Sequence, residues 1–533
     1  MIKCYPMKKI QFCAVIFLLT ILTAFSQESK NYKIKCNIDK SFNKYQYDFE
    51  YLTQLCDSTF PKINETFSRN IQSEMQKLIL NRLGKPDVND LIFSIQCKKY
   101  LAKFSNQHTN IQLKIENPNF YPFIIYPHQG KLYLNNIDKS IDSTHIGKEI
   151  TALNNIAVTN IIAEFKNIAM AENEISKINS LRVNREFMVP ENYSELNIFK
   201  QDSLKITFND GKFCTISKLQ SKDINFYKII AKPNNITNKD LQKRPYTYSF
   251  YNDVAYLQFN ACMDKQAMLD GIDDYIPALL RGEARKILGK QYKLDIEKQD
   301  DRVVGNINKE FPFFKDFLED LFTKLNKNNT NKLIIDLRNN NGGEERLGLQ
   351  LLYYLTENEH LKNFKSYFYP TNVFKFYFER DYLRYEDKYK LDNNGKLPPK
   401  GIALFEKKEV FEEITNPNSN YFINPKRNVF KGKVVVLANH NTASAAALLT
   451  TLIQDNNLGT IIGTSVSNNP TGATQFTPFE LPKTKAKVSI ASMYLERPDS
   501  TKGDVQIPDY WIEKTFLDAL NGKDPLYEKA LKL

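Results

Sequence analysis

The chain has 533 residues, of which 42% are hydrophobic and 25% are charged. This length and composition exclude a peptide hormone and a disordered tail, and they allow two to four domains with their own cores. The formal net charge is +12, but the lysines and arginines form no long run and no zinc-finger, bZIP or RRM signature is present. We therefore interpret the basic excess as solvated surface and expect no nucleic-acid partner.

The first 26 residues have the organisation of a secretory signal peptide. Lys8 and Lys9 precede an apolar run over 10–25, and small or polar residues follow it. A run of this length crosses a hydrocarbon core of about 30 Å only with difficulty. We expect a signal peptide over 1–26 and an exported protein, periplasmic or secreted, without stable membrane insertion after its removal; a single N-terminal anchor is the alternative.

Removal of that segment would leave five cysteines at wide spacings and without a C-x-x-C pair, namely Cys36, Cys56, Cys97, Cys214 and Cys262. Export permits disulfides, but an odd number at these spacings defines no framework. A bridge between Cys36 and Cys56 is one candidate.

The next segment is expected to be helical. Apolar residues recur at intervals of three and four from Tyr45 to about Asn106, which predicts an N-terminal helical region over 27–120. Apolar and polar residues alternate over 111–115, which predicts the first strand near the end of this region.

A compact β-rich module is predicted over 121–220. The stretch from Ile150 to Phe165 indicates a strand, an Asn-Asn turn and a helix, and the turn at 209–211 indicates a second strand pair. The polar segment 221–249 contains two prolines and is interpreted as a linker.

The remainder, 250–533, is expected to be an α/β domain. Val254–Phe259 is predicted to be a strand. Short runs rich in β-branched residues at Lys332–Leu337 and Lys433–Ala438 show no alternation, which predicts strands buried on both faces of a mainly parallel sheet. An aromatic and charged insertion at about 360–430 has no assigned structure.

Two segments could carry chemistry, and the first is the glycine pair Gly342-Gly343 between a strand and a helical pattern. Adjacent glycines at such a junction can adopt positive φ and expose backbone N–H groups, so a negatively charged oxygen could dock there. The alternative is a tight turn that merely requires glycine.

The second segment surrounds Ser444, which opens the helical pattern after the strand Lys433–Ala438. A hydroxyl in this place has the positive end of the helix and the Ala445 amide beside it, as an acyl-transfer nucleophile requires. The alternative is a helix cap formed by Asn441, Thr442 or Ser444.

These motifs in this order resemble the catalytic domain of the tail-specific, or C-terminal processing, serine proteases. Beyond the glycine pair and Thr-Ala-Ser-Ala, the resemblance rests on Gly463, Pro470-Thr471-Gly472-Ala473, Leu481-Pro482, Pro508-Asp509 and Asn521-Gly522-Lys523-Asp524-Pro525. It runs from about Val254 to the end, and Gly147 to Val158 is similar to the family's PDZ-like core. The resemblance implies a ClpP/crotonase-like catalytic domain, a PDZ-like module at 121–220, and an endopeptidase that acts on extended or unfolded polypeptides, which the module could read by their C-terminus.

The family resemblance implies Ser444 as the nucleophile, with the amides of Ala445, Gly342 and Gly343 holding the oxyanion. Branches of the family use different general bases. The bacterial processing branch uses a lysine about 25 residues after the serine. This chain has Asn469 there.

The branch that includes the tricorn protease core and the retinoid-binding-protein-like domains takes a histidine from the N-terminal segment instead. His108 stands in the turn Phe104–Thr109, where that histidine belongs, and imidazole accepts a serine proton near neutral pH. We therefore expect His108 to be the base, with His440 as the competitor.

The third catalytic member is expected to be a carboxylate of the C-terminal part. This chain has Gln107 and Lys502 where the family often has a serine and a glutamate, so Glu496, Asp499 and Asp504 are the candidates and Glu496 is preferred. These departures leave an alternative, an impaired family member that binds peptides or another ligand, such as a lipid or retinoid. No H-E-x-x-H, G-x-x-x-x-G-K-[ST] or G-x-G-x-x-G motif is present, so we expect no cofactor and no metal.

Overall fold

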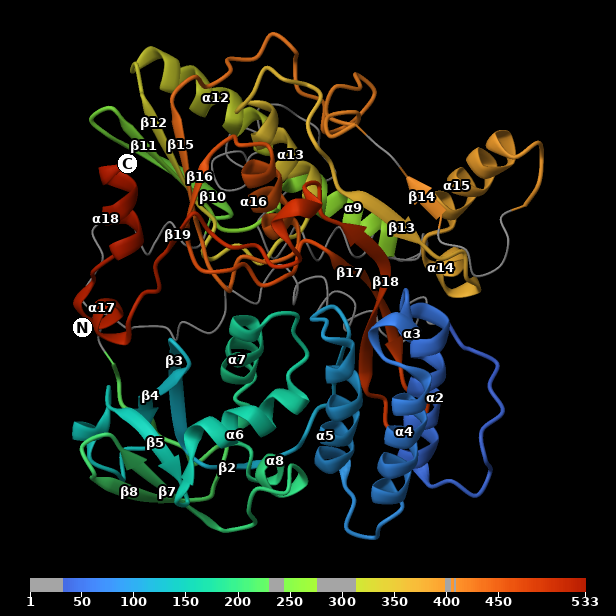
Figure 1. Cartoon of the computed structure of the whole chain (residues 1–533), viewed down its shortest axis with the longest axis vertical. Coiled ribbons are helices and arrows are strands. Elements are labelled where there is room, and N and C mark those ends of the chain that lie inside the picture. The colour runs from blue at the N-terminus through green and yellow to red at the C-terminus, as the bar shows by residue number, and fades with distance from the viewer. Residues whose placement is uncertain (1–31, 230–243, 276–312, 398–403, 407–408) are drawn as a thin grey trace.

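The computed structural model describes residues 32–229, 244–275, 313–397, 404–406 and 409–533. In Figure 1 they form an N-terminal helical region and a β-rich module side by side, with an α/β domain above both. The expected signal peptide lies outside the described residues, as does the linker segment 230–243. No helix within the described ranges is long and apolar enough to cross a membrane.

The N-terminal region is helical, as predicted. Its helices are α2 (Lys44–Thr59), α3 (Ile63–Thr66), α4 (Arg69–Leu83) and α5 (Asp90–Leu101). Asn43 caps α2 by accepting the N–H groups of Tyr45 and Gln46 at 2.9 and 3.0 Å, and the Gln46 side chain accepts the Asn43 N–H in return. Such a reciprocal box satisfies N–H groups that the helix itself leaves unpaired. The expected strand over 111–115 is shorter and earlier, β1 (Asn110–Gln112).

The β-rich module has one antiparallel sheet with its own core. Its strands run in the order β3 (Phe123–His128), β4 (Lys131–Ile137), β5 (Glu149–Leu153), β7 (Ser203–Phe208) and β8 (Phe213–Ser217), with β6 (Ile156–Ala157) beside β5. Its helices are α6 (Val158–Phe165), α7 (Glu174–Val183) and α8 (Pro190–Glu195), and a short pair joins β2 (Asn119–Phe120) to β9 (Leu219–Gln220). Asn154 and Asn155 have φ values of 47° and 63°, so the predicted tight turn is confirmed.

The α/β domain is built on a mainly parallel sheet, as predicted. The strand order is β10 (Tyr246–Tyr251), β11 (Val254–Phe259), β12 (Lys332–Asp336), β15 (Lys433–Ala438), β16 (Thr460–Gly463) and β19 (Tyr510–Trp511), and only β10 runs antiparallel to its neighbour. The described helices of this domain are α9 (Lys265–Tyr275), α12 (Phe314–Lys327), α13 (Glu345–Tyr353), α16 (Ala445–Asp455), α17 (Phe516–Asn521) and α18 (Pro525–Lys532).

The strand β10 corrects the C-terminal end of the expected linker. It begins at Tyr246, inside the segment 221–249, and pairs with β11 along its whole length. The aromatic and β-branched run from Tyr246 to Tyr251 is the sequence signal for this strand, whereas Pro245 just before it favours a linker.

A second sheet joins the front of the chain to its C-terminal half. The long strand β18 (Lys487–Glu496) pairs with β17 (Gly472–Glu480), with β1 at its start and with β13 (Lys365–Phe368) at its end. The insertion at about 360–430 thus adds β13 and β14 (Leu404–Glu406) to this sheet, together with α14 (Asn372–Tyr377) and α15 (Glu379–Asp392). In Figure 1 the hairpin β17–β18 extends down beside α2, α4 and α5.

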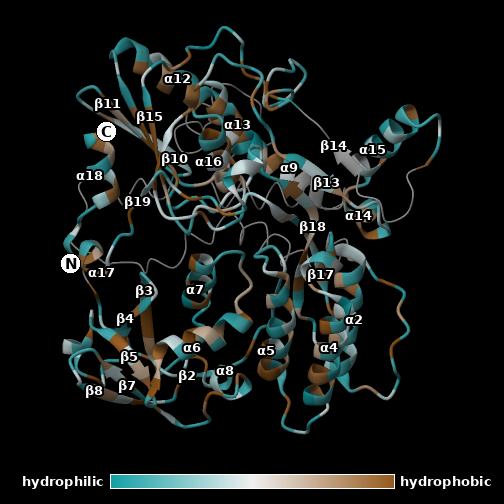
Figure 2. Ribbon diagram, in the orientation of Figure 1, coloured by the Kyte–Doolittle hydropathy of each residue, from teal (hydrophilic) through white to brown (hydrophobic). Residues whose placement is uncertain are grey.

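Apolar packing and one buried carboxylate hold this hairpin to the N-terminal helices. Figure 2 shows hydrophobic residues on α4, α5 and β17, and Tyr100 and Phe479 belong to one buried cluster there. Asp48 of α2 is fully buried and accepts the N–H groups of Lys483 and Thr484 in the turn between β17 and β18. The N-terminal helices are therefore an integral part of the structure around β18.

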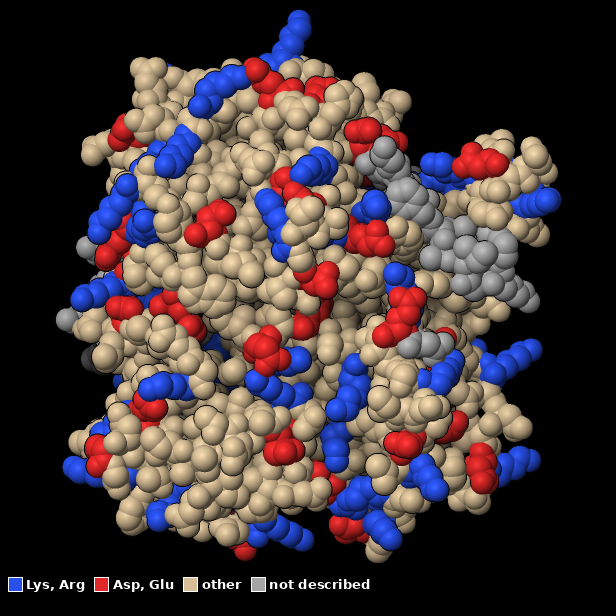
Figure 3. Space-filling view, in the orientation of Figure 1, with Lys and Arg blue, Asp and Glu red and all other residues tan. Residues whose placement is uncertain are grey.

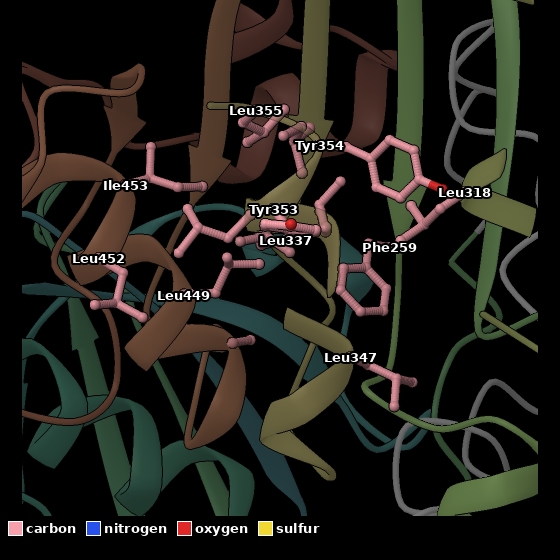
Figure 4. Packing of buried hydrophobic residues seen from close by; sticks show 14 of the residues in the cluster. Phe259, Leu318, Leu337, Leu347, Tyr353, Tyr354, Leu355, Leu449, Leu452 and Ile453 are labelled. Atoms are coloured by element: carbon pink, nitrogen blue, oxygen red, sulfur yellow. The ribbon is translucent and has the colours of Figure 1, made fainter. Parts of the chain in front are cut away.

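The helices behind the parallel sheet pack tightly on one another. Leu347 of α13 and Leu449, Leu452 and Ile453 of α16 are buried in one cluster (Figure 4). A Cβ on Gly348 would lie 3.4 Å from the Cβ of Leu449, so the two helices approach closely at this glycine. This packing fixes the start of α16, where Ser444 lies.

Two expectations from the sequence concern the described cysteines and the distribution of surface charge. All five described cysteines are free thiols, so the candidate bridge between Cys36 and Cys56 is not formed. On the face drawn in Figure 3, Lys and Arg are interspersed with Asp and Glu, which agrees with the interpretation of the positive charge as solvated surface.

Candidate active site

Ser444 lies in a strained turn between β15 and α16. It has φ 50° and ψ −128°, and its side chain makes no capping hydrogen bond to the helix. A non-glycine residue at such a φ costs on the order of 1–3 kcal/mol and is frequent at active sites. The alternative of a capping serine is therefore wrong. Thr442 does not cap α16 either, because its hydroxyl donates to the Leu337 carbonyl at 2.9 Å and so ties the turn to the end of β12.

The glycine pair lies against this turn. A Cβ on Gly342 would be 2.6 Å from the Cβ of Ser444 and 2.9 Å from the Ala445 nitrogen. A Cβ on Gly343 would be 2.2 Å from the Cys262 carbonyl oxygen. The φ values are 97° and 129°, so both positions require glycine for conformation and for space.

The expected oxyanion donors differ in availability. Ala445 is the first residue of α16, so its N–H has no acceptor within the helix. The Gly342 N–H already donates to Oδ1 of Asn340 at 2.9 Å. The prediction that the Gly342 N–H binds the oxyanion is therefore not met in this structure, because this N–H donates to the buried Asn340 side chain. The amides of Ala445 and Gly343 remain as candidates.

His108 reaches the α/β domain through the sheet. It lies two residues before β1, and its carbonyl accepts the Ser489 hydroxyl of β18 at 2.8 Å. The Ala491 N–H donates to the Thr109 hydroxyl at 3.0 Å. The pairing of β1 with β18 thus carries a histidine from the front of the chain to the second half.

The His108 loop and the Ser444 turn share one neighbour, the segment 467–468. Oε1 of Gln107 accepts the Ser467 hydroxyl at 2.5 Å, and Oδ1 of the adjacent Asn468 accepts the Ser444 N–H at 2.5 Å. The Ser467 N–H also donates to the Thr442 carbonyl at 2.8 Å. The structure therefore holds both loops on the same short segment.

The two candidate histidines are both in surroundings that favour the neutral form. Burial lowers the pKa of His108 to about 4, and its Nδ1 has no hydrogen-bond partner among the described residues. A neutral imidazole can accept a proton at neutral pH. Burial and the nearby Arg182 lower the pKa of His440 to about 3. His440 belongs to the Ser444 turn itself, four residues before the serine, whereas the hydrogen bonds described above bring His108 to that turn from the front of the chain.

A residue that sequence reasoning missed lies in the cavity beside the nucleophile. This cavity is small, about 10 Å³, and its lining consists of Glu172, Ser444, Leu448, Asn468, Asn469, Gly472, Ala473, Thr474 and Leu495. Glu172 precedes α7, and burial raises its pKa to about 8. It is the ionisable residue among these nine. The short stretch around it resembles no motif, so no local signal marks it.

The preferred third member, Glu496, lies elsewhere. It ends β18, and its carboxylate accepts the Tyr367 hydroxyl at 3.0 Å and lies 3.6 Å from Nζ of Lys365. Ser489, which bonds the His108 carbonyl, is seven residues earlier on the same strand, or about 23 Å away at a rise of about 3.3 Å per residue. The structure therefore does not bring Glu496 to His108.

The other carboxylates named from the sequence do not replace it. The Asp499 side chain accepts from Thr501 and Lys362, and Asp504 is exposed. Lys502 donates to the Gln454 carbonyl at 2.8 Å, next to the last residue of α16. The eleven residues of α16 span about 16 Å, so Lys502 lies at the opposite end of this helix from Ser444.

Comparison with protein families now decides the identity of the catalytic part. Residues 310–511 match the family model described as peptidase family S41, and this range contains the glycine pair and Ser444. Residues 310–511 belong to peptidase family S41. The chain is thus a serine-type peptidase whose segment 310–511 belongs to that family, and the resemblance to the tail-specific proteases is confirmed.

Two solved structures with a similar fold align with most of this chain. The structure of mature CPAF aligns with 92% of this chain and with 96% of the CPAF chain, at a TM-score of 0.55 and 13% sequence identity. The structure of mature CPAF complexed with lactacystin aligns with 92% of this chain and with 97% of the CPAF chain, at a TM-score of 0.56 and 14% sequence identity. At these identities the likeness shows a shared mixed α/β fold. No curated protein matches the chain in sequence.

Proposed function

We propose that this S41 peptidase is an exported endopeptidase that hydrolyses peptide bonds in extended or unfolded polypeptides through an acyl-enzyme on Ser444. The observation that carries the proposal is the strained, uncapped Ser444 at the start of α16, with the Gly342–Gly343 backbone against it. An uncapped hydroxyl held at a helix N-terminus beside a backbone N–H is suited to nucleophilic attack on a carbonyl.

In the proposed reaction His108 is the base. The Ser444 hydroxyl attacks the peptide carbonyl and gives its proton to the imidazole, and the oxyanion accepts the N–H groups of Ala445 and Gly343. His108 then gives the proton to the leaving amine as the C–N bond breaks. A water molecule attacks the acyl-enzyme with its proton going to His108, which releases the acid and restores Ser444. The imidazole and hydroxyl need to meet only when substrate is bound, since catalytic hydrogen bonds are often loose without it.

Substrate selection is assigned to the β-rich module, taken as a PDZ-like module. A peptide could add as a strand to one edge of its sheet and present its C-terminal carboxylate. One edge strand, β3, lies beside the segment 513–516, because the Tyr126 hydroxyl donates to the Lys514 carbonyl at 2.6 Å and the Gln129 N–H donates to Glu513 at 3.1 Å. The opposite edge, β8, is therefore the proposed peptide edge. Amidation of a substrate's C-terminus should then weaken its binding.

Export rests on the pattern of the first 26 residues. Fractionation of a natural host that expresses the full chain tests it, with a periplasmic or released product shortened by about 26 residues as the expected result. Retention of the full-length chain in the membrane would favour the N-terminal anchor.

An active-site fluorophosphonate probe tests the proposed chemistry. We expect labelling of the wild type, none in Ser444→Ala, and much slower labelling in His108→Ala, because the probe reacts with an activated serine. His440→Ala is the matched control and should label at the wild-type rate. Absence of wild-type labelling would favour the alternative of an impaired binding protein, which the departures at Gln107, Asn469 and Lys502 motivate.

A further inference from the structure

Glu172 gathers hydrogen bonds from both loops that frame Ser444. Its Oε1 accepts Nδ2 of Asn106 at 3.2 Å and Nδ2 of Asn468 at 3.1 Å. Its Oε2 accepts the Asn469 N–H, and the Gln107 N–H also bonds to the carboxylate. Two of these donors therefore come from the loop just before His108, and two from the loop that bonds the Ser444 amide.

The number of donors decides what this carboxylate can do. An ionised carboxylate offers about four lone-pair sites on its two oxygens. Three hydrogen bonds and the nearby Gln107 N–H take up this capacity, so the carboxylate offers no well-placed site to accept the Ser444 proton. Glu172 is thus poorly suited as the general base, although it shares the cavity with Ser444.

The same bonds continue to the nucleophile and to a distant strand. Asn468 donates to Glu172 and accepts the Ser444 N–H at 2.5 Å through its Oδ1. Nδ2 of Asn106 bonds both Glu172 and, at 2.6 Å, the Ala473 carbonyl of β17. One carboxylate therefore connects the Ser444 backbone, the start of β17 and the loop that carries His108.

We propose that Glu172 is a positioning residue of this active site, an acid in the cavity beside Ser444 that holds the His108 loop against the Ser444 turn. The inference rests on the proposed function of Ser444 and His108. It places an acid beside the His108 loop, whereas Glu496 lies at the far end of β18 and bonds Tyr367. In contrast to a triad acid, Glu172 acts through the loop backbone and through Asn468, not on the imidazole.

The chemistry of the surroundings fits an ionised group in this role. All four partners are N–H donors from amides, and none of them titrates; the titratable side chain on the attached loop is His108. Bonds from N–H donors to an ionised acceptor are shorter and stronger than neutral ones. A protonated carboxyl would turn an O–H toward donors, so the arrangement loosens when Glu172 takes up a proton.

Replacement of the acid by its amide tests the proposal. In Glu172→Gln one oxygen becomes an NH₂ group that faces N–H donors, so the two loops separate slightly while the cavity keeps its size. Because a misplacement of about 1 Å can cost about 100-fold in rate, we expect kcat and the rate of fluorophosphonate labelling to fall by about 10- to 100-fold at pH 9, where the wild-type carboxylate is ionised, with KM little changed. Glu174→Gln, two residues away at an exposed side chain, is the matched control and should behave as wild type.

The outcomes separate this inference from the proposed function. Absence of wild-type labelling overturns the function and the inference together. Equal labelling of wild type and a folded Glu172→Gln overturns the inference alone. If Glu172→Gln does not fold, Asn468→Ala decides, since it keeps the acid and removes its connection to Ser444. A labelling rate reduced at least several-fold is expected there, and an unchanged rate overturns the inference.

A double-mutant cycle distinguishes positioning from a general loss of structure. If Glu172 acts through Asn468, then Glu172→Gln with Asn468→Ala should label no more slowly than the worse single variant, because both changes break the same connection. Fully additive losses would overturn the route through Asn468.

Discussion

The backbone of Gly342 packs directly against Ser444: a Cβ on Gly342 would lie 2.6 Å from the Cβ of Ser444, closer than Cβ atoms approach in proteins. The contact sets the turn after β12 against the turn after β15, at the carboxyl ends of two adjacent parallel strands. It is the geometric reason why the glycine pair and the serine form one site although they are about a hundred residues apart.

The contact predicts that Gly342→Ala removes activity. The new methyl group would meet Ser444, the Ala443 carbonyl at 2.7 Å and the Ala445 nitrogen at 2.9 Å, so the nucleophile turn must shift. Fluorophosphonate labelling should fall by about 100-fold or more. The control is Gly130→Ala, which has a comparable φ of 75° and nothing within 4 Å, and which should cost about 1 kcal/mol of stability with normal labelling. Normal labelling of Gly342→Ala would contradict the proposed geometry.

The pH dependence of labelling should follow Glu172 and not His108. Burial lowers the pKa of His108 to about 4, so its imidazole is neutral throughout pH 6–9. Burial raises the pKa of Glu172 to about 8, so the carboxylate forms as the pH rises through that value. We expect the labelling rate of the wild type to rise between pH 7 and 9, beyond the intrinsic reactivity of the probe. The rate of Glu172→Gln should stay flat after the same correction, and a parallel rise in both proteins would speak against this assignment.

Acid should destabilise the fold through His440. Its pKa is lowered to about 3 by burial, whereas an unfolded histidine titrates near about 6.5. Between these values the unfolded state binds more protons than the folded state, so the free energy of unfolding falls as the pH falls from about 6.5 toward about 3. Urea unfolding of His440→Gln at pH 7 and 5 should show a smaller loss than the wild type. His360→Gln, at a side chain that is 89% exposed, should keep the wild-type loss.

The ion pair of Arg497 with Asp455 should be a major support of α16. Both side chains are buried, at 2% and 0% exposure, and the guanidinium also donates to the carbonyls of Lys502 and Gly503. Arg497→Met leaves a buried carboxylate without its main partner, which should cost about 3–5 kcal/mol of unfolding free energy. Arg69→Met breaks a pair at 2.9 Å whose arginine is 57% exposed, and it should cost about 0–1 kcal/mol. Equal costs in urea titrations would refute this ranking.

Glu496 should be dispensable for chemistry. Its carboxylate bonds Tyr367 on the neighbouring strand, far along β18 from Ser489. Glu496→Gln should therefore leave kcat/KM within about twofold of wild type and change stability by about 0.5 kcal/mol or less. A loss of activity as large as that of His108→Ala would restore Glu496 as the third catalytic member.

Local patterns were sufficient for much of the fold. The buried runs at Val254–Phe259 and Lys433–Ala438 are the strands β11 and β15, and the Asn154-Asn155 turn forms where predicted. These signals are local because a strand buried on both faces needs consecutive apolar residues and a tight turn needs residues that tolerate positive φ. The misplaced linker end at Tyr246 shows the limit, since only pairing with β11 makes that run a strand.

The sequence by itself indicated the type of chemistry through the order and spacing of several motifs, since Ser444 after a buried strand or the glycine pair alone is equally compatible with a helix cap or a tight turn. Only the tertiary structure decided which groups surround the serine. Asn340 takes the Gly342 amide, and Glu172 bonds Asn468 across 296 residues of chain. The carboxylate of Glu496 accepts the Tyr367 hydroxyl instead of lying near His108. A hydrogen bond depends on distance in space, and the pairing of β1 with β18, which brings the front of the chain to its end, has no counterpart in any short stretch of sequence.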